Sequence, residues 1–382
     1  MAVAKLAMKR RGAVNWPGFS RRAARHSSHF ALEAFKVKQL VGLLLLSVVT
    51  VVSANGTPTE AAARDGVILA SAKGTHTLSI VDAKTLAIVA SLPIGPDPHE
   101  VVVSDDGLTA YVSDMGNITY HQIDVLDLKN RKALPPIDTG PLTGPHGLAF
   151  VEGKIWFTAQ GAKVVARIDA KSGQVDWVKG TGQYWTHMLV LSQDHATIFA
   201  TNIGSGTLSV FHYESVPPLT TALGYVRSGR EPVMDWVHTV LPAAVGLEGI
   251  DISPDGEEVW ATTPVTGQIF VASVAGRQIK RIIDSKFIGA SRLKFTRDGT
   301  RVLVTNLRTG ELVILDAKNG AERKRIHVGT GCSGLLIAPD DRRAFVACAF
   351  DNYVGVVDLQ SYQVTRHIDV GSEPDGLAWA PQ

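Results

Sequence analysis

Short runs of alternating apolar and polar residues recur along the chain from residue 66 to its end. The stretch GPDPHEVVVSDDGLTAYVSD, residues 95–114, is one example, with two apolar runs on either side of an Asp-Asp-Gly turn. Alternation with a period of two predicts a half-buried β-strand, and Asp-Gly between two such runs predicts a tight hairpin. We therefore expect a chain built mainly from short antiparallel strands.

The hairpin pattern is repeated at intervals of about 40 residues. Further copies open with GPHGLAF, QYWTHMLVL, VGLEGIDI, GASRLKF and GCSGLLI, and EPDGLAWAPQ at the C-terminus opens a last one. Each complete unit continues into a third strand that ends on Asp and a turn, such as LSIVDAKT, and then into a fourth strand. Four short strands in a unit of about 40 residues are typical of a β-propeller blade.

The two ends of the repeat region complete one another. Residues 66–95 supply strands two to four of a blade, whereas residues 373–382 supply a first strand alone. Joining these pieces would close the ring and remove exposed sheet edges. With the six continuous units, the sequence predicts an all-β fold. The prediction is a single seven-bladed β-propeller over residues 66–382, closed by a C-terminal first strand that joins three N-terminal strands.

Several second strands share a motif after their turn. It reads LVTN at residues 303–306, FATN at 199–202 and YVSD at 111–114. These segments resemble the repeat of the YVTN family of seven-bladed propellers, of the secreted bacterial type. The resemblance covers residues 66–382 and implies the fold. Related propellers include binding proteins, lactonase-like enzymes and redox enzymes, so the resemblance does not imply one function.

Alignment of the seven first strands places one residue of each blade immediately in front of its strand. These residues are His99, His146, His187, Glu248, Ser291, Ser333 and Asp375. They are separated by 47, 41, 61, 43, 42 and 42 residues. Because the first strand of a propeller blade is innermost, we expect these side chains to form one ring around the central channel. This ring is the candidate binding site.

Three interpretations of the ring remain open. It is a solvated polar funnel, a pocket for a small molecule or peptide, or a metal site. For a metal, the ligands would be His99, His146, His187 and Glu248, since imidazole and carboxylate groups bind Zn, Cu, Mn and Ni. Glu248 could then also act as a general base. The sequence assigns no certain cofactor, and a divalent metal in the channel is the candidate.

The chain has two cysteines, Cys332 and Cys348. Cys332 lies at the start of a first strand, and Cys348 lies at the end of the second strand of the same hairpin. A tight turn at residues 339–342 would place residue 332 opposite 348 or 349, so we expect a cross-strand disulfide. Two buried thiols, or a soft-metal site for Cu(I), are the alternatives.

Charge is distributed unevenly along the chain. Residues 1–54 hold nine Lys or Arg and one acidic residue, which leaves 29 basic and 35 acidic residues, a net charge of −6, in the remainder. The basic stretch ends in an apolar run at 40–52 followed by small residues, a pattern that predicts a secretory signal cleaved near Ala54. An uncleaved anchor is the alternative, although the run is short for a membrane span. We expect a periplasmic or extracellular protein.

The predicted organisation is therefore an N-terminal extension with signal (1–54), a linker (55–65) and the propeller (66–382). One blade carries a long insertion at about residues 213–246. Within it, DWVHTVL is expected to form an outer strand, and residues 215–232 are expected to form a long loop that could cap the channel or contact a partner. The negative charge of the mature chain disfavours nucleic acid. We expect a monomer without a membrane span.

These observations leave three functional hypotheses. The first is a secreted propeller that binds a small ligand or protein partner at the channel mouth without chemistry. It is favoured because the sequence has no P-loop, Rossmann fingerprint, haem-attachment or nucleophile-elbow motif. The second is a metal-dependent enzyme, lactonase-like or redox, that uses the same ring. The third is a structural scaffold for protein interactions.

Overall fold

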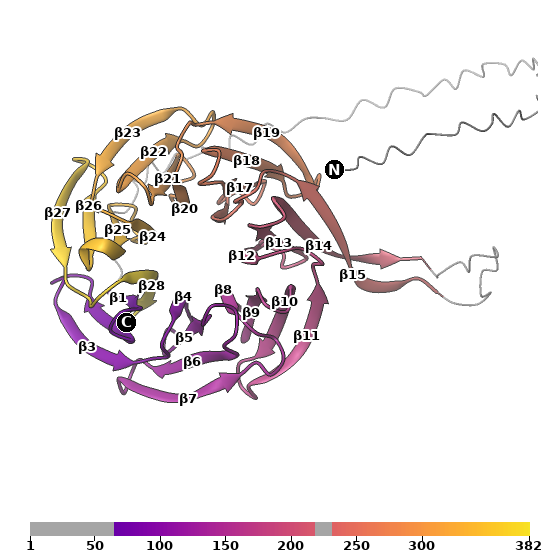
Figure 1. Ribbon diagram of the computed structural model, residues 1–382, viewed down its shortest axis with the longest axis horizontal. Helices are drawn as coiled ribbons and strands as arrows, with labels where there is room; N and C mark the ends of the chain where they lie inside the picture. The colour runs from indigo at the N-terminus through magenta and orange to yellow at the C-terminus, as the bar shows by residue number, and fades with distance from the viewer. Residues whose placement is uncertain (1–64, 218–230) are drawn as a thin grey trace, which may run out of the picture. The chain divides into compact units, whose positions relative to one another are not determined.

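The computed structural model describes residues 65–217 and 231–382. The predicted signal and extension, and all of the linker except its last residue, lie outside the described residues, as does most of the loop expected at 215–232. The described residues form seven four-stranded antiparallel sheets arranged in a ring (Figure 1). The predicted all-β, seven-bladed propeller is therefore confirmed. A single-turn 3₁₀ helix, η1 (Ala349–Asp351), is the one helical element within these ranges.

Each blade contributes one strand to each of four concentric layers. The innermost strands are β28 (Pro374–Pro381), β4 (Pro98–Val103), β8 (Pro145–Val151), β12 (Thr186–Leu191), β16 (Ile250–Ile252), β20 (Ala290–Phe295) and β24 (Cys332–Ile337). The second strands are β1 (Gly66–Ala72), β5 (Thr109–Asp114), β9 (Lys154–Ala159), β13 (Thr197–Asn202), β17 (Glu258–Thr262), β21 (Arg301–Asn306) and β25 (Arg343–Cys348).

The two outer layers complete the blades. The third strands are β2 (Thr77–Asp82), β6 (Gln122–Asp127), β10 (Val164–Asp169), β14 (Thr207–Val216), β18 (Gln268–Ser273), β22 (Glu311–Asp316) and β26 (Tyr353–Asp358). The outermost strands are β3 (Ile88–Pro93), β7 (Lys132–Asp138), β11 (Gln174–Gly180), β15 (Val233–Pro242), β19 (Gln278–Asp284), β23 (Glu322–His327) and β27 (Gln363–Ile368).

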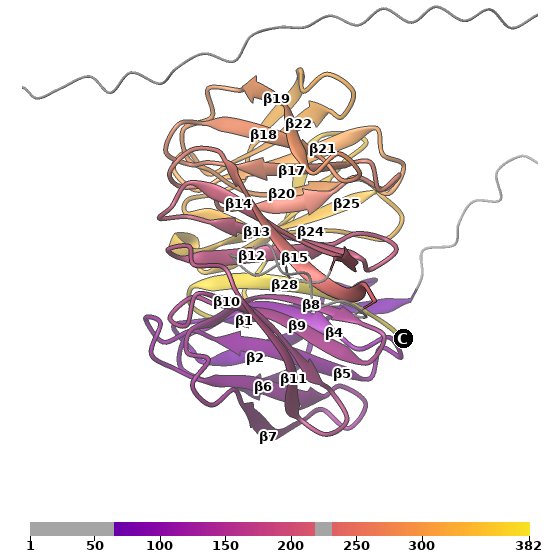
Figure 2. The ribbon, with the colours of Figure 1, turned by 90° about the vertical axis from the view of Figure 1, so that its right-hand side faces the viewer.

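We number the blades from the one that closes the ring. Blade 1 has the strand order β28-β1-β2-β3, and blades 2 to 7 follow in chain order, from β4–β7 to β24–β27. The C-terminal strand β28 thus pairs with β1 at the other end of the described chain, as Figures 1 and 2 show. This is the predicted closure: β1 is paired on both sides, with β28 and β2, and β28 takes the innermost place that β4 has in blade 2.

The hydrophobic core lies between the blades. Second and third strands are buried along most of their length, whereas outer strands such as β11 and β19 alternate between exposed and half-buried positions. A typical cluster joins Ile68 and Val81 of blade 1 to Phe345 and Val356 of blade 7. Each sheet therefore buries both faces of its middle strands against its neighbours, and stability depends on a closed ring.

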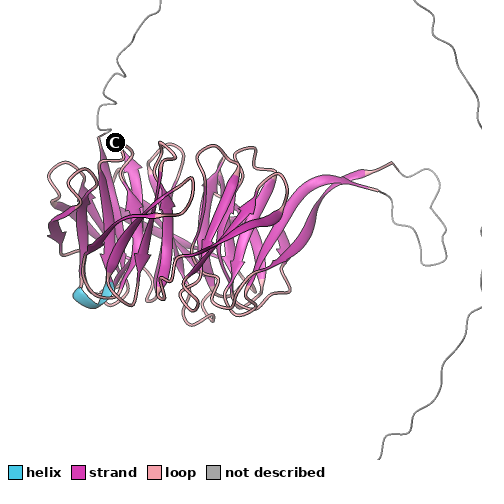
Figure 3. Ribbon diagram, turned by 90° about the horizontal axis from the view of Figure 1, so that it is seen from above, coloured by secondary structure: helices cyan, strands magenta, loops and turns pink. Residues whose placement is uncertain are grey.

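Blade 4 carries the predicted insertion. Its strands β14 and β15 pair over ten residues, from Thr207↔Pro242 to Val216↔Val233, and the hairpin extends beyond the rest of the blade (Figure 3). DWVHTVL lies within β15, so the prediction of an outer strand there is confirmed. Among the described residues, no helix is long and apolar enough to cross a membrane.

Candidate functional site

A local break in strand pairing turns the predicted ring residues toward the channel. In β4, the register with β5 shifts between Pro98 and Val101, so that His99 and the residue after it are unpaired. The same shift occurs in β8, β12, β20 and β24, around the other ring positions. A bulge of this kind redirects a side chain away from the pleat. The sequence analysis placed every ring residue in front of its strand. In the structure most of them lie inside their strands, and Glu248 alone precedes its strand, β16.

Hydroxyl groups hold these bulges and connect neighbouring blades. In five blades a Ser or Thr of the second strand donates a hydrogen bond to the ring-residue carbonyl of the next blade. The donors are Ser71, Thr158, Thr201, Thr262 and Thr305, and the carbonyls belong to His99, His187, Glu248, Ser291 and Ser333. Several of these hydroxyls also accept the backbone N–H of the residue after the ring position in their own blade, as Thr158 does from Gly147.

The residue after the ring position is glycine in four blades because the next blade lies against it. A Cβ added at Gly147 would lie 2.6 Å from the carbonyl oxygen of His187, and one at Gly249 would lie 2.1 Å from that of Ser291. Such distances are far inside van der Waals contact, so no side chain fits there. The recurring glycine is therefore explained by crowding between neighbouring blades near the axis.

The ring residues surround a cavity of about 280 Å³, which we call the ring cavity. Six of the seven predicted residues line it: His99, His146, His187, Glu248, Ser333 and Asp375. Ser291 is fully buried and does not line it. Lys73, Arg292 and Glu373 contribute the other charged groups. The predicted ring residues therefore come together in space. The Ser291 hydroxyl points to Glu248 instead of lining the cavity.

The three histidines lie side by side in blades 2, 3 and 4. The ring centroids of His99 and His146 are 4.5 Å apart, and those of His146 and His187 are 3.9 Å apart, with tilted planes in both pairs. Nδ1 of His187 contacts the side-chain amide of Gln160 at 2.7 Å. Nδ1 of His146 is buried and has no hydrogen-bond partner among the described residues. Nε2 of His99 is likewise buried without a hydrogen bond, but a carboxylate oxygen of Asp97 lies 3.3 Å from it.

His99 lies between two carboxylates. Its Nδ1 is 3.3 Å from an oxygen of Asp375, and its Nε2 is 3.3 Å from an oxygen of Asp97, a contact outside hydrogen-bond geometry. Asp375 also pairs with Lys73 at 2.6 Å. Burial would raise the pKa of Asp375, but Lys73 and His99 outweigh it and hold that pKa well below its usual value.

The three imidazoles differ in their affinity for a proton. Burial lowers the pKa of His146 well below its ordinary value, and the neighbouring His187 and His99 act in the same direction. Burial also lowers the pKa of His187, with a further contribution from Arg292. Burial opposes protonation of His99 too, but the carboxylates of Asp375 and Asp97 outweigh it and raise the pKa of His99. The tier favours charge on His99 and neutrality on the other two.

The opposite side of the ring is closed by its own hydrogen bonds. The Ser291 hydroxyl donates to Oε1 of Glu248 at 2.7 Å and lies 3.0 Å from the Ser333 hydroxyl. Arg292 donates to the same Glu248 oxygen at 2.9 Å. In blades 5, 6 and 7 the ring positions therefore satisfy one another.

Arg292 crosses the channel beneath the ring. One amino group of its guanidinium contacts Glu248 of blade 5, and the other contacts Glu100 of blade 2 at 2.7 Å. Burial would lower the pKa of Arg292, but Glu100 and Glu248 outweigh it and raise that pKa above its usual value. Arg292 also lines a second cavity of about 130 Å³, walled by leucines such as Leu148 and Leu335. It therefore forms the floor of the ring cavity and the roof of the lower one.

Two metal sites were considered from the sequence, one at the histidines of the ring and one at the two cysteines. Within residues 65–217 and 231–382, no group of three or more His, Cys, Asp or Glu side chains is arranged so that it could hold a metal ion. Cys332 and Cys348 lie directly opposite in the register of β24 and β25 and form a disulfide. The metal hypothesis for His99, His146, His187 and Glu248 stays a prediction.

Some residues of the site were missed in the sequence. Lys73 lies in the turn after β1, and nothing in the ASAKGTHT stretch marks it as a channel residue. Arg292 directly follows the ring position of blade 6, so its place near the channel can be read from the alignment, but its pairing across the channel cannot. Gln160 has no sequence signal, since it follows β9 at a position that has no shared residue type among blades.

Comparisons with known proteins agree on the fold. No protein-family profile and no curated protein sequence matches the chain. Hydrazine synthase from Kuenenia stuttgartiensis is similar in structure, with a TM-score of 0.62 and 17% identity over 80% of this chain and 98% of that one. A Bacteroides uniformis protein provisionally named a 6-phosphogluconolactonase has a TM-score of 0.64 and 16% identity over 83% and 99%.

The dihydro-heme d1 dehydrogenase NirN, solved in complex with DHE, has a TM-score of 0.56 and 13% identity over 82% of this chain and 74% of that one. At such identities the likeness shows the fold alone. The class of protein is therefore the seven-bladed β-propeller, and its activity has to be argued from the ring cavity.

Proposed function

We propose that this protein is a secreted propeller, of the YVTN repeat type, that binds a small polar ligand in the ring cavity. The observation that carries the proposal is the buried Nδ1 of His146, which lacks a hydrogen-bond partner among the described residues and belongs to a side chain that lines the cavity. An unsatisfied buried polar atom costs about 1–3 kcal/mol. A ligand that reaches this nitrogen would remove that cost.

The size and closure of the cavity support a small ligand. Its volume, about 280 Å³, is close to the lower limit of about 300 Å³ for small-molecule pockets. Arg292 closes it below, so a ligand enters from the side of the ring where the inner strands begin. A rigid floor and walls favour binding because few groups have to be ordered when the ligand arrives.

The charges around the cavity indicate the chemistry of the ligand. The carboxylates of Glu248, Glu373 and Asp375 face the cations of Lys73 and Arg292, and His99 favours its charged form. Neither sign dominates, so the cavity suits a molecule with both hydrogen-bond donors and acceptors more than a simple ion. A neutral imidazole such as that of His146 can serve either kind of group.

Secretion is the second part of the proposal. Its support is the signal pattern that ends near Ala54 and the disulfide between Cys332 and Cys348, because disulfides persist in oxidising compartments. We expect the mature protein in the periplasm or outside the cell. Mass spectrometry of the N-terminus of protein recovered from the periplasmic fraction tests the cleavage site.

A thermal-shift screen tests ligand binding. Amino acids, sugar acids and hydroxylated lactones are added to the wild type and to His146→Ala, with His195→Ala in an exposed turn as the matched control. A compound that raises the melting midpoint of the wild type and of His195→Ala, but not of His146→Ala, supports the site. A compound whose effect persists in His146→Ala binds elsewhere, and a screen without any hit would favour a protein partner.

A metal-dependent enzyme is the second candidate. It is favoured by three adjacent imidazoles, two of them neutral, since a metal binds the neutral form. Some propellers of similar fold are named as enzymes. Elemental mass spectrometry of protein purified without chelator, beside the His99/His146/His187 triple-Ala variant, tests it. A stoichiometric metal that the variant lacks would favour this candidate, and none after reloading with Zn, Cu, Ni and Mn would count against it.

A further inference from the structure

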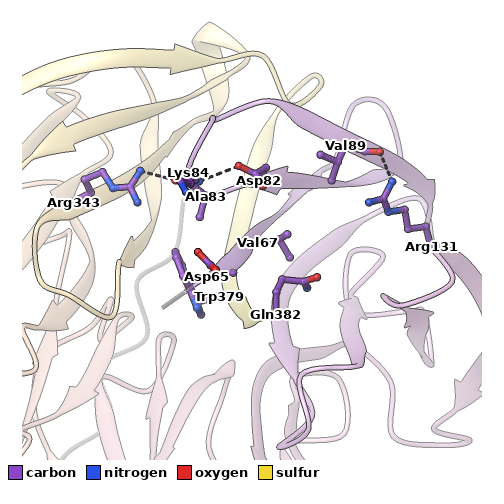
Figure 4. A pocket seen from close by; sticks show the side chains of 11 residues that line it. Asp65, Val67, Asp82, Ala83, Lys84, Val89, Arg131, Arg343, Trp379 and Gln382 are labelled. Carbon is purple, nitrogen blue, oxygen red and sulfur yellow. Dashed lines mark hydrogen bonds between the residues drawn. The ribbon is translucent and has the colours of Figure 1, made fainter. Parts of the chain in front are cut away.

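Blade 1 differs from the other blades because its inner hairpin has no turn. In blade 7, for example, residues 338–342 connect β24 to β25. In blade 1 the corresponding strands are β28, the last strand, and β1, the first strand, so no turn joins them. A cavity of about 570 Å³ lies where the two strand ends meet, and we call it the closing-blade groove (Figure 4).

The groove is separate from the ring cavity. Pro374 and Asp375 at the start of β28 line the ring cavity, whereas Trp379 and Gln382 at its other end line the groove. Lys84 of blade 1, Arg131 of blade 2 and Arg343 of blade 7 bring three cations to it. In Figure 4 the two arginines approach from opposite sides, with Trp379 between them.

Two arginines at the same position of neighbouring blades differ in their hydrogen-bond acceptors. Arg301 is the first residue of β21 in blade 6, and Arg343 is the first residue of β25 in blade 7. Arg301 donates one hydrogen bond to the carbonyl of Leu359 and a second to the carbonyl of Asp341, in the turn of blade 7. Arg343 donates the first of these bonds, to the corresponding carbonyl of Ala83 in blade 1.

The second acceptor of Arg343 is missing because blade 1 has no turn to supply it. Among the described residues, the guanidinium of Arg343 makes no other hydrogen bond and no ion pair, and its carbon lies 5.6 Å from the centroid of the Phe345 ring. Its guanidinium therefore presents unused N–H donors to the groove. A guanidinium offers five donors in a planar fork, which matches the oxygens of a carboxylate or phosphate.

The remaining groups favour an anion as well. Arg131 donates to the carbonyl of Val89, and neither Arg131 nor Lys84 forms an ion pair with another described residue. Two carboxylates, Asp65 and Asp82, also line the groove. Oδ1 of Asp82 already accepts hydrogen bonds from its own turn, including the backbone N–H groups of Lys84 and Thr85. The side chains that line the groove thus bring three cations and two carboxylates, one of which is already engaged in its own turn.

We propose that the closing-blade groove binds a small molecule through its carboxylate or phosphate group. One oxygen of that group takes, beside Arg343, the position that the Asp341 carbonyl takes beside Arg301. Trp379 forms the wall between the arginines and covers the bound molecule from one side. The site is distinct from the ring cavity, and its ligand is anionic where that of the ring cavity is of mixed charge.

Calorimetric titration of the purified protein at constant ionic strength tests the proposal. Inorganic phosphate and succinate are titrated separately, so that the two arms distinguish a phosphate ligand from a carboxylate. We expect one equivalent of at least one anion to bind the wild type. Loss of a charge-assisted hydrogen bond in Arg343→Ala should weaken it about tenfold or more.

Arg301→Ala is the matched control, because this arginine has the same anchor but already has its second acceptor, the carbonyl of Asp341. It should bind the anion as the wild type does, and so should His146→Ala, which separates this site from the ring cavity. Arg343→Lys keeps the charge without the fork and should bind with intermediate affinity, which covers the case that Arg343→Ala does not fold. Equal affinity in the wild type, Arg343→Ala and Arg343→Lys would overturn the proposal, and so would the absence of binding of either anion at millimolar concentration.

Discussion

The two halves of the ring are built from the same position in the blade but satisfy their polar atoms differently. In blades 5 to 7, Glu248, Ser291 and Ser333 form a continuous set of hydrogen bonds. In blades 2 to 4, the imidazoles of His99, His146 and His187 lie against one another, and the middle one has a buried nitrogen without a partner in the described part of the chain.

This difference indicates where a ligand would be held. A half that is already satisfied gains little from a ligand and serves as a wall, whereas the imidazole half gains a hydrogen bond. Arg292 connects the two halves from below, through Glu248 on one side and Glu100 on the other. Changing either half, or the arginine between them, tests this interpretation.

Loss of Arg292 should have the largest effect. Arg292→Met leaves Glu100 and Glu248 without their cation. We expect the free energy of unfolding to fall by about 3 kcal/mol. This is the lower end of the usual cost of breaking a buried ion pair, because both carboxylates still line a cavity. Lys294→Met, on the same strand as Arg292, breaks a pair in which Lys294 is exposed and Asp251, on β16, is half-buried. It should cost less than about 1 kcal/mol, since Asp251 keeps the hydrogen bond from the backbone N–H of Phe295. Urea unfolding measures both, and equal costs would show that the channel pair is not special.

Removal of a bulge hydroxyl should cost about 2 kcal/mol in either half, because a carbonyl and an amide lose their partner. Thr158→Ala removes the bond to the carbonyl of His187, and Thr305→Ala removes the bond to that of Ser333. Stability should fall equally, but only Thr158→Ala should weaken ligands of the ring cavity. If Thr305→Ala weakens them as much, the two halves bind the ligand together.

Acid should destabilise the imidazole half. The unfolded chain protonates His146 and His187 below about pH 6.5, but burial lowers the pKa of both in the folded protein, so the unfolded state binds more protons as pH falls. Each of these histidines changes the free energy of unfolding by up to about 1.4 kcal/mol per pH unit. After the opposing contribution of His99, we expect the free energy of unfolding to fall by about 1 kcal/mol between pH 6.5 and 5.5.

His99 acts with the opposite sign. Its raised pKa adds stability that is complete below about pH 6.5 and is lost as pH rises through the folded-state value. Thermal unfolding at a series of pH values should therefore show a shallower slope in His146→Asn and a steeper one in His99→Asn. Ser291→Ala, in the other half, should leave the slope unchanged, and a change there would contradict the assignment.

A gain of stability is the smallest expected effect. Blade 7 has Ala347 where other blades have the bulge hydroxyl, and it holds the Cys332–Cys348 disulfide instead. Ala347→Ser places a hydroxyl between the N–H of Gly334 and the carbonyl of Asp375, and should stabilise the protein by about 0.5–1 kcal/mol. Ala347→Val, which adds bulk without a hydroxyl, is the control. Equal shifts in the melting midpoint of both variants would argue against the hydroxyl network.

Much of the site could be predicted because positions that align between repeats also lie at equivalent places in the structure. Equivalent residues of a propeller occupy equivalent places around one axis, so aligning His99, His146 and His187 was enough to predict a common tier. The same alignment did not predict that Ser291 turns inward to Glu248, since a ring position specifies a place but not a side-chain direction. Nor did it indicate Lys73, whose turn shares no motif with the other blades.

The sequence by itself determined the class of structure. Strand periodicity, the count of six complete units and the two complementary ends specify a closed seven-bladed ring, because only closure pairs every inner strand. Tertiary structure alone decided the chemistry of the channel and of the groove. Arg292 meets Glu100 across 192 residues of chain, and Arg343 faces a missing turn, because both depend on which blades adjoin once the ring is closed.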